Sequence, residues 1–168
     1  MTITVGFSRP KSGFVPFAWA IMWYQGSDFS HSYIRFKSNS LDRELIYQAS
    51  STMVNFWGAT YFESKETIAA EYEIEVTDDQ YRQLMQYFID NAGKPYGVLQ
   101  LVAMFVNRTF GIKLDALTNG DREFVCSELV ARILSDLDIP EGTENLDYML
   151  PVDVKHICDT SPRFKRIR

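Results

Sequence analysis

The spacing of apolar residues changes near residue 77, and this change constrains the fold more strongly than any other feature of the sequence. Before it, the chain consists of short β-like runs; residues 71–76, for example, alternate polar and apolar side chains, which is typical of a half-buried strand. After it, apolar residues recur at helical spacing, most clearly over residues 123–137. Strands followed by helices, without regular alternation of the two, predict an α+β fold.

Turn signals divide the first half of the chain into elements. Residues 2–8 predict a strand, and the aromatic-rich residues 14–25 predict a short helix packed on the core. Two β-like runs, His31 to Lys37 and Glu44 to Ser50, flank a polar turn and predict a β-hairpin. The aromatic residues 53–63 are expected to be extended. The first half is therefore expected to supply an antiparallel sheet.

The second half carries helix signals. Thr77 is a good N-cap because its hydroxyl can accept from a free backbone amide, and Gly93 is a plausible C-cap. The remaining expected elements are a buried helix over 97–107, a polar loop over 111–121 that forms a rim over a cleft, an amphipathic helix over 123–137 ended by residues 139–142, a helical turn over 151–157, and a closing strand or basic tail over 163–168.

Length and composition fit a single globular domain over residues 1–168. The net charge of −5 predicts no nucleic-acid partner, because non-specific affinity for nucleic acid requires a concentrated cationic surface. The start of the chain lacks the pattern of a signal peptide, and the most apolar stretch, Gly97 to Val106, is far shorter than the roughly 20 residues of a transmembrane helix. The default expectation is a cytoplasmic protein, although release by lysis or association with a virion would require no signal either.

Only two cysteines and two histidines are present, so any thiol or imidazole chemistry must use Cys126, Cys158, His31 or His156. Two cysteines do not make a disulfide framework. One residue separates His156 from Cys158, which is not the spacing of a zinc-ligand pair. We therefore expect no metal site and interpret His156 and Cys158 as structural.

The other pair has the stronger claim to chemistry. Cys126 lies in the first turn of a predicted helix, where free backbone amides and the positive end of the helix dipole favour a thiolate. His31 begins a predicted strand and is the natural base. The hairpin would place Gln48 or Ser50 beside it, and a Gln carbonyl can orient an imidazole. Each residue also has a simpler interpretation: a small core residue, a structural histidine, a solvent-facing amide.

Several short motifs, in this order, shift the balance toward chemistry. They are Ser30-His31-Ser32-Tyr33-Ile34, Leu45-Ile46-Tyr47-Gln48-Ala49, Gly93-Lys94-Pro95-Tyr96-Gly97, Phe124-Val125-Cys126-Ser127-Glu128-Leu129 and Leu150-Pro151-Val152-Asp153. The ordered set resembles the circularly permuted branch of the NlpC-type papain-like hydrolases, which includes YiiX-like and lecithin:retinol-acyltransferase-like proteins. The resemblance covers roughly residues 3–155, and the opening Val-Gly-Phe-Ser is similar to small phage and bacterial members.

This resemblance implies a papain-like fold in which the nucleophilic cysteine begins a helix packed against an antiparallel sheet. It implies Cys126 as the nucleophile and His31 as the base, with Gln48 at the position of a third polar residue that is often Glu in YiiX-like members. A Gln cannot compensate the charge of an imidazolium, which would weaken thiolate activation. Tyr96 matches a tyrosine near the active site and would either donate to an oxyanion or simply pack under the Pro turn.

The expected function is a thiol hydrolase that forms an acyl-enzyme and requires no metal or organic cofactor. The resemblance suggests two kinds of substrate, peptide amides of peptidoglycan, which we favour, and acyl esters of lipids, handled by a transferase or thioesterase of the same fold. The alternatives are a catalytically weak binding module and a structural virion or host-takeover protein with an aromatic interface. The aromatic clusters at residues 23–24 and 56–62 are expected to pack in the core rather than line a groove. The oligomeric state stays open.

Overall fold

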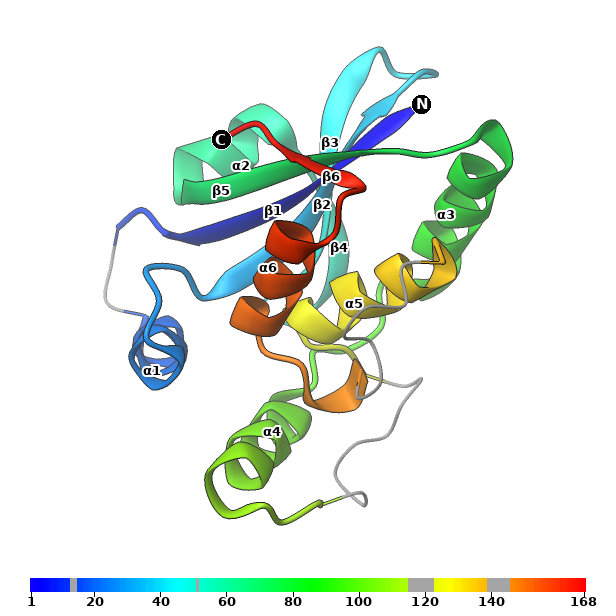
Figure 1. The fold of residues 1–168 in the computed structure, drawn as a ribbon. Coiled ribbons are helices and arrows are strands. Elements are labelled where there is room, and N and C mark those ends of the chain that lie inside the picture. Colours follow the sequence, from blue (N-terminus) through cyan, green and yellow to red (C-terminus); the bar gives the residue numbers. More distant parts are fainter. Residues whose placement is uncertain (13–14, 51, 115–122, 139–145) are drawn as a thin grey trace.

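A computed structural model describes the chain except for residues 13–14, 51, 115–122 and 139–145 (Figure 1). Its centre is a six-stranded antiparallel sheet in the order β4-β3-β2-β1-β5-β6. The strands are β1 (Thr2–Pro10), β2 (His31–Ser38), β3 (Arg43–Ser50), β4 (Met53–Gly58), β5 (Glu66–Glu75) and β6 (Phe164–Arg166). The expected strand at residues 2–8 and the expected hairpin at residues 31–50 are both confirmed.

Helices lie on both faces of this sheet, which confirms the α+β class. They are α1 (Pro16–Gln25), α2 (Ala59–Lys65), α3 (Asp78–Asn91), α4 (Val98–Phe110), α5 (Cys126–Asp136) and α6 (Pro151–Thr160), with a short 3-10 turn at Leu146–Tyr148. The main core lies between the sheet and helices α3, α5 and α6. A smaller cluster of Tyr33, Ile46, Ala59 and Phe62 lies under α2 on the opposite face.

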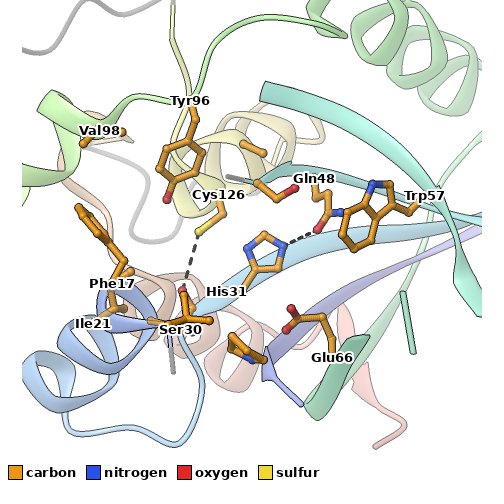
Figure 2. A pocket seen from close by; sticks show the side chains of 15 residues that line it. Phe17, Ile21, Ser30, His31, Gln48, Trp57, Glu66, Tyr96, Val98 and Cys126 are labelled. Carbon is orange, nitrogen blue, oxygen red and sulfur yellow. Dashed lines mark hydrogen bonds between the residues drawn. The ribbon is translucent and has the colours of Figure 1, made fainter. Parts of the chain in front are cut away.

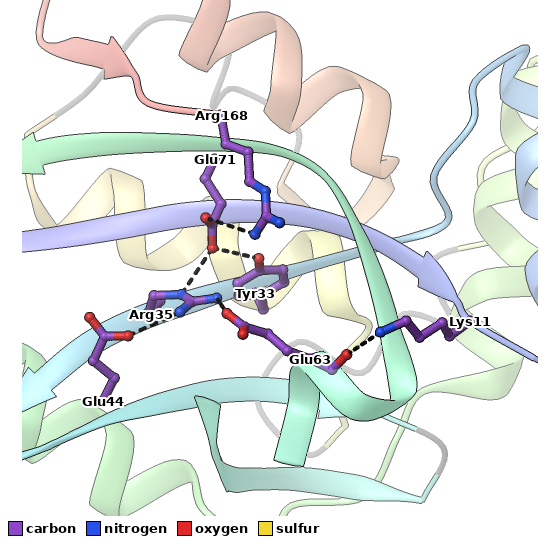
Figure 3. Close-up of polar contacts among 7 residues, drawn as sticks. All are labelled: Lys11, Tyr33, Arg35, Glu44, Glu63, Glu71 and Arg168. Atoms are coloured by element: carbon purple, nitrogen blue, oxygen red, sulfur yellow. Dashed lines mark hydrogen bonds and ion pairs between the residues drawn. The ribbon is translucent and has the colours of Figure 1, made fainter. Parts of the chain in front are cut away.

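A polar network covers part of the α2 face (Figure 3). Arg35 of β2 forms ion pairs with Glu44 of β3 at 3.0 Å, Glu63 of α2 at 2.7 Å and Glu71 of β5 at 2.9 Å. The Tyr33 hydroxyl donates to Glu71 at 2.8 Å. These contacts join three strands and one helix, so burial of the Arg35 charge is compensated by carboxylates on every side.

Helix α3 follows its sequence signals closely. The Thr77 hydroxyl accepts from the Gln80 backbone amide, and the Gln80 side chain accepts in return from the Thr77 amide, which completes a capping box. Gly93 takes the left-handed conformation with φ of 84° just after the helix, where a side chain would be strained. The chain thus turns sharply before Pro95.

Two expectations about the aromatic segments are wrong. Residues 53–58 are extended, but residues 59–65 form α2, whose buried Ala59 and Phe62 cap the small cluster. Helix α1 forms as expected, and its buried Ile21 packs with Leu101, Met104, Val125 and Leu150 in a second cluster, the α1–α4 cluster. Its two tryptophans lie outside this cluster, because Trp19 is 58% and Trp23 83% exposed. Trp23 therefore does not pack in the core, whereas Phe62 does.

The helices of the second half also differ in detail from the sequence pattern. Helix α4 is amphipathic rather than buried, because Val98, Leu99 and Val102 are exposed. The expected turn at residues 151–157 is a ten-residue helix, and residues 164–166 pair with β5 as a strand, not a basic tail. Residues 115–121 of the expected loop lie outside the described residues. So do residues 139–142, which were expected to end the amphipathic helix. Among the described residues, no helix is both long enough and apolar enough to cross a membrane.

Candidate active site

The four residues singled out in the sequence line one cavity of about 290 Å³ at the end of the sheet (Figure 2). Cys126 comes from the start of α5, His31 from the start of β2, Gln48 from β3 and Tyr96 from the turn before α4. The other lining residues are Pro10, Val15, Phe17, Ala18, Ile21, Ser30, Ala49, Ser50, Trp57, Glu66 and Val98.

Local pairing positions the cysteine. Val125 is extended and caps α5, so Cys126 is the first helical residue, where backbone amides have no intrahelical acceptor. Phe124 just before it forms a parallel bridge with Tyr96, and its carbonyl accepts from the Gly97 amide at 3.0 Å. This bridge brings the turn at residues 93–97 alongside the helix start, which explains how Tyr96 reaches the cysteine.

The β2–β3 register positions Gln48. Ile34 lies opposite Tyr47, so continuing the register would place His31 opposite Ser50, with Gln48 as its diagonal neighbour on the same face. The longer side chain makes the contact: His31 Nε2 donates to Gln48 Oε1 at 2.7 Å. The Gln48 amide nitrogen donates to Asn55 Oδ1 at 3.3 Å, which fixes the orientation of the amide. Because Nε2 carries this proton, Nδ1 is the nitrogen left for Cys126.

Cys126 and His31 shift each other's pKa. Burial raises the pKa of the Cys126 thiol, but the hydrogen bond and positive charge of His31, together with Ser32, lower it below the usual thiol value. Burial acts to lower the pKa of His31, whereas its contact with Cys126 and the charge of Glu66 raise it above 6.5. Opposite shifts of this kind favour a thiolate–imidazolium pair, the reactive form of a nucleophilic cysteine.

Tyr96 belongs to the same group of side chains. Its hydroxyl lies toward Cys126 in the cavity (Figure 2), and burial together with the charge of the thiolate raises the pKa of the phenol well above 10. The phenol therefore keeps its proton and remains a donor at any physiological pH. The ring also packs against both the main core and the α1–α4 cluster, so donation and packing coexist at this residue.

Sequence reasoning missed Glu66, Ser8 and any role for Ser32. Glu66 lines the cavity, and the buried Ser8 hydroxyl donates to its carboxylate at 3.0 Å. The backbone amide and hydroxyl of Ser32 act to lower the pKa of the Cys126 thiol. Ser32 follows His31 directly in a motif, and Ser8 ends the opening Val-Gly-Phe-Ser segment, so a signal was available for both residues. Nothing in the local sequence singles out Glu66.

The second cysteine–histidine pair lies outside the cavity. Cys158 is buried in the main core, and its surroundings raise the pKa of its thiol far above the usual value. His156 is exposed on α6. Both cysteines are free thiols. The interpretation of this pair as structural fits its placement.

Apolar side chains make one wall of the cavity. Phe17 and Ile21 of α1 lie on the same side of the cavity as Val98 at the start of α4, and Trp57 lies beyond Gln48 (Figure 2). The rings of Tyr24 and Phe105 meet edge to face at 4.7 Å and hold the two helices together. Of the aromatic clusters expected to pack in the core, Trp57 therefore borders the cavity instead.

The six-stranded antiparallel sheet with helices on both of its faces defines the class of this chain as an α+β fold. A solved member of this fold is the metalloprotein YiiX from Escherichia coli O157:H7, whose crystal structure matches this chain with a TM-score of 0.63 at 14% identity, covering 99% of this chain and 94% of that chain. The chain thus has a YiiX-like fold. No family model matches the sequence, and neither does any curated protein.

The structure of YiiX is described as that of a metalloprotein, which raises the question of whether the cavity of this chain could hold a metal ion. Over the described residues, no three side chains of His, Cys, Asp or Glu lie close enough together to hold a metal ion. Around His31, the ring nitrogen that faces away from Cys126 is already hydrogen-bonded to Gln48. The described residues of this cavity therefore do not fit a protein-bound metal ion.

Proposed function

We propose that this chain is a cysteine hydrolase or acyltransferase of the permuted papain-like type, with Cys126 as nucleophile and His31 as its base. The observation that carries the proposal is the convergence of a helix-start cysteine with an oriented His31–Gln48 pair in one cavity. A nucleophile, a base within reach of it and a third group that fixes the base are the parts that nucleophilic catalysis requires.

The proposed reaction proceeds through a thioester. The Cys126 thiolate adds to the carbonyl carbon of an amide or ester, and the negative charge moves to the carbonyl oxygen. The Tyr96 hydroxyl and the Cys126 backbone amide are the donors available to that oxygen. As the C–N or C–O bond breaks, the His31 imidazolium gives its proton to the leaving amine or alcohol. Neutral His31 then accepts a proton from water, which attacks the thioester and releases the acid.

The cavity lining favours a substrate with an apolar acyl group. The wall built from Phe17, Ile21 and Val98 carries no charge, and no Lys or Arg is among the described residues that line the cavity. A preference for the peptidoglycan amide rests only on the family resemblance. The lining supports acyl esters of lipids as the second candidate, because an uncharged wall solvates an alkyl chain better than a polar muropeptide.

The test is the reactivity of Cys126 toward iodoacetamide as a function of pH, followed by mass spectrometry. We expect alkylation of Cys126 to begin well below the pH at which an ordinary thiol ionises, and to shift to that pH in His31→Ala. Cys126→Ala is the matched control, because it leaves only the buried Cys158 and should remain unlabelled. If wild-type Cys126 titrates like an ordinary thiol, the catalytic proposal is wrong.

A second measurement separates the substrate classes. The protein is incubated with p-nitrophenyl acetate, p-nitrophenyl octanoate and a muropeptide mixture, and acyl adducts on Cys126 are sought by mass spectrometry. Faster acylation by the octanoyl than by the acetyl ester supports the lipid-like substrate, and an adduct only from muropeptides supports the amidase. If Cys126 is activated but no substrate acylates it, the cavity belongs to a binding module.

A further inference from the structure

We propose that Glu66 is the carboxylate that compensates the positive charge of the His31 imidazolium, taking over the charge that Gln48 lacks. Glu66 is a positioning residue in this sense, because it acts through His31 and not on a substrate. The inference rests on the proposed function only where it gives the Glu66 charge a role in activating Cys126. The effect of Glu66 on the protonation of His31 can be measured without any assay of activity.

A β-bulge places Glu66 on the same face of the sheet as His31. In the β1–β5 pair, Phe7 lies opposite Ala70, but Ser8 lies opposite Ile68, so the register shifts by one residue. Such a shift reverses which face each following side chain occupies. Ile68 accordingly packs with the cluster under α2 although Ala70 belongs to the main core. Without the bulge, Glu66 would point away from His31.

Ser8 links the two residues. It lies directly opposite His31 in the β1–β2 pair, and its buried hydroxyl donates to Glu66 Oε2 at 3.0 Å. Its backbone carbonyl accepts from the Ser30 amide at 3.0 Å, which fixes the chain at the entry to β2. Figure 2 shows the Glu66 carboxyl group below the imidazole and Gln48 above it. The ring is thus held between an amide acceptor and a carboxylate.

Among the described titratable side chains that line the cavity with His31, Glu66 is the carboxylate that can compensate the imidazolium charge. The titratable side chains that line the cavity with His31 are Cys126, Tyr96 and Glu66, from three different segments. Burial raises the pKa of Glu66, while the charge of His31 and the Ser8 hydroxyl act to lower it. Glu66 in turn contributes to the raised pKa of His31. The reciprocal effect on the two groups agrees with an electrostatic attraction between them.

The chain offers a direct readout because it has only two histidines. In proton NMR titrations, the ring C–H signal of exposed His156 is the internal reference, assigned with His156→Gln. In Glu66→Gln we expect the midpoint of His31 to fall by about one pH unit while His156 does not move. Glu75→Gln, which removes the same charge from the exposed far end of β5, is the matched control and should leave both midpoints unchanged.

A double variant distinguishes a charge from a merely structural contact. Adding Gln48→Glu to Glu66→Gln returns a carboxylate to His31 from the other strand, and we expect it to restore most of the lost midpoint. Alkylation of Cys126 at pH 7 should be roughly threefold to tenfold slower in Glu66→Gln than in wild type and recover in the double variant.

The two proposals fail in different ways. If the His31 midpoint in Glu66→Gln equals that of wild type, the role of Glu66 is wrong, whatever the reactivity of Cys126. The same titration in Cys126→Ala measures the effect of Glu66 without the thiolate. Suppose that Glu66→Gln lowers the His31 midpoint in the Cys126→Ala background, but wild-type Cys126 is unreactive. The role of Glu66 would then be supported, and only the catalytic proposal would be overturned.

Discussion

At the scale of single residues, the Tyr96 side chain combines two contacts that serve different purposes. The ring packs against two hydrophobic clusters, and the hydroxyl lies toward Cys126 in the cavity. Removing only the hydroxyl separates these functions, because phenylalanine keeps the ring and loses the donor. If the hydroxyl stabilises an oxyanion, its loss lowers turnover far more than it changes the ionisation of the cysteine.

We therefore predict that Tyr96→Phe lowers kcat on a p-nitrophenyl ester by about 100-fold, the usual cost of one lost oxyanion donor. Alkylation of Cys126 at pH 7 should stay within about threefold of wild type, because His31 is the main group that lowers the pKa of this thiol. Steady-state kinetics and iodoacetamide labelling on the same preparation check both parts. Unchanged turnover would assign Tyr96 to packing alone.

The candidate site was predictable where its residues carry local signals. Cys126 follows from its place at a helix start, and His31 with Gln48 from the hairpin, whose antiparallel register brings the two together. Glu66 has no such signal, because its approach to His31 depends on a one-residue bulge and on a serine fifty-eight positions away. The catalytic roles of the four predicted residues remain predictions.

At the scale of elements, the tightest constraint lies between β1 and β2. Gly6 is paired with Tyr33, whose ring covers the glycine so closely that an added Cβ would lie 2.1 Å from it. A methyl group there must displace Tyr33, which would break its hydrogen bond to Glu71 and disturb the cluster under α2. Glycine is thus required here for the close approach of a ring.

We predict that Gly6→Ala lowers the free energy of unfolding by about 2–3 kcal/mol, the usual cost of overpacking a core. Gly58→Ala is the matched control, because a Cβ there meets nothing within 4 Å and its φ of −67° suits any residue. It should change stability by less than about 1 kcal/mol. Urea unfolding of the two variants makes the comparison, and equal midpoints would contradict the steric argument.

Among the elements, those with strong patterns were predicted and those set by tertiary contacts were not. The Thr77 cap and the hairpin depend on neighbouring residues, so local sequence suffices for them. Helix α2 is only seven residues long between two strands, and its aromatic residues favour extended structure in isolation. It is helical because Ala59 and Phe62 then cover Tyr33 and Ile46.

At the scale of the whole molecule, one buried carboxylate connects the site helix to the stability of the fold. Glu128 lies in the same first turn of α5 as Cys126, with its side chain fully buried. It accepts from Gln100 of α4 at 2.6 Å and pairs with Arg132 at 2.8 Å. Burial raises the pKa of Glu128 to about 7, although Arg132 and Gln100 act to lower it. The folded state thus binds this proton more tightly than the unfolded state does.

The raised pKa of Glu128 determines the direction in which the free energy of unfolding changes with pH. Between an unfolded pKa of 4.5 and a folded pKa of about 7, the folded chain holds more protons at Glu128 than the unfolded chain. Stability from this group is therefore complete below pH 4.5 and is lost as the pH rises through 7. The size of the effect is on the order of 3 kcal/mol, because each pH unit of difference is worth about 1.4 kcal/mol.

We predict that the free energy of unfolding of wild type falls relative to that of Glu128→Gln as the pH rises from about 4.5 to about 8. The glutamine amide keeps an acceptor for Gln100 and does not titrate. Urea unfolding at several pH values gives the two curves, and their difference removes the contributions of all other groups. Glu75→Gln, at an exposed strand end, should run parallel to wild type. Parallel curves for Glu128→Gln would mean that Arg132 holds the carboxylate ionised, and that α4 and α5 are joined through an ionised Glu128 over the whole range.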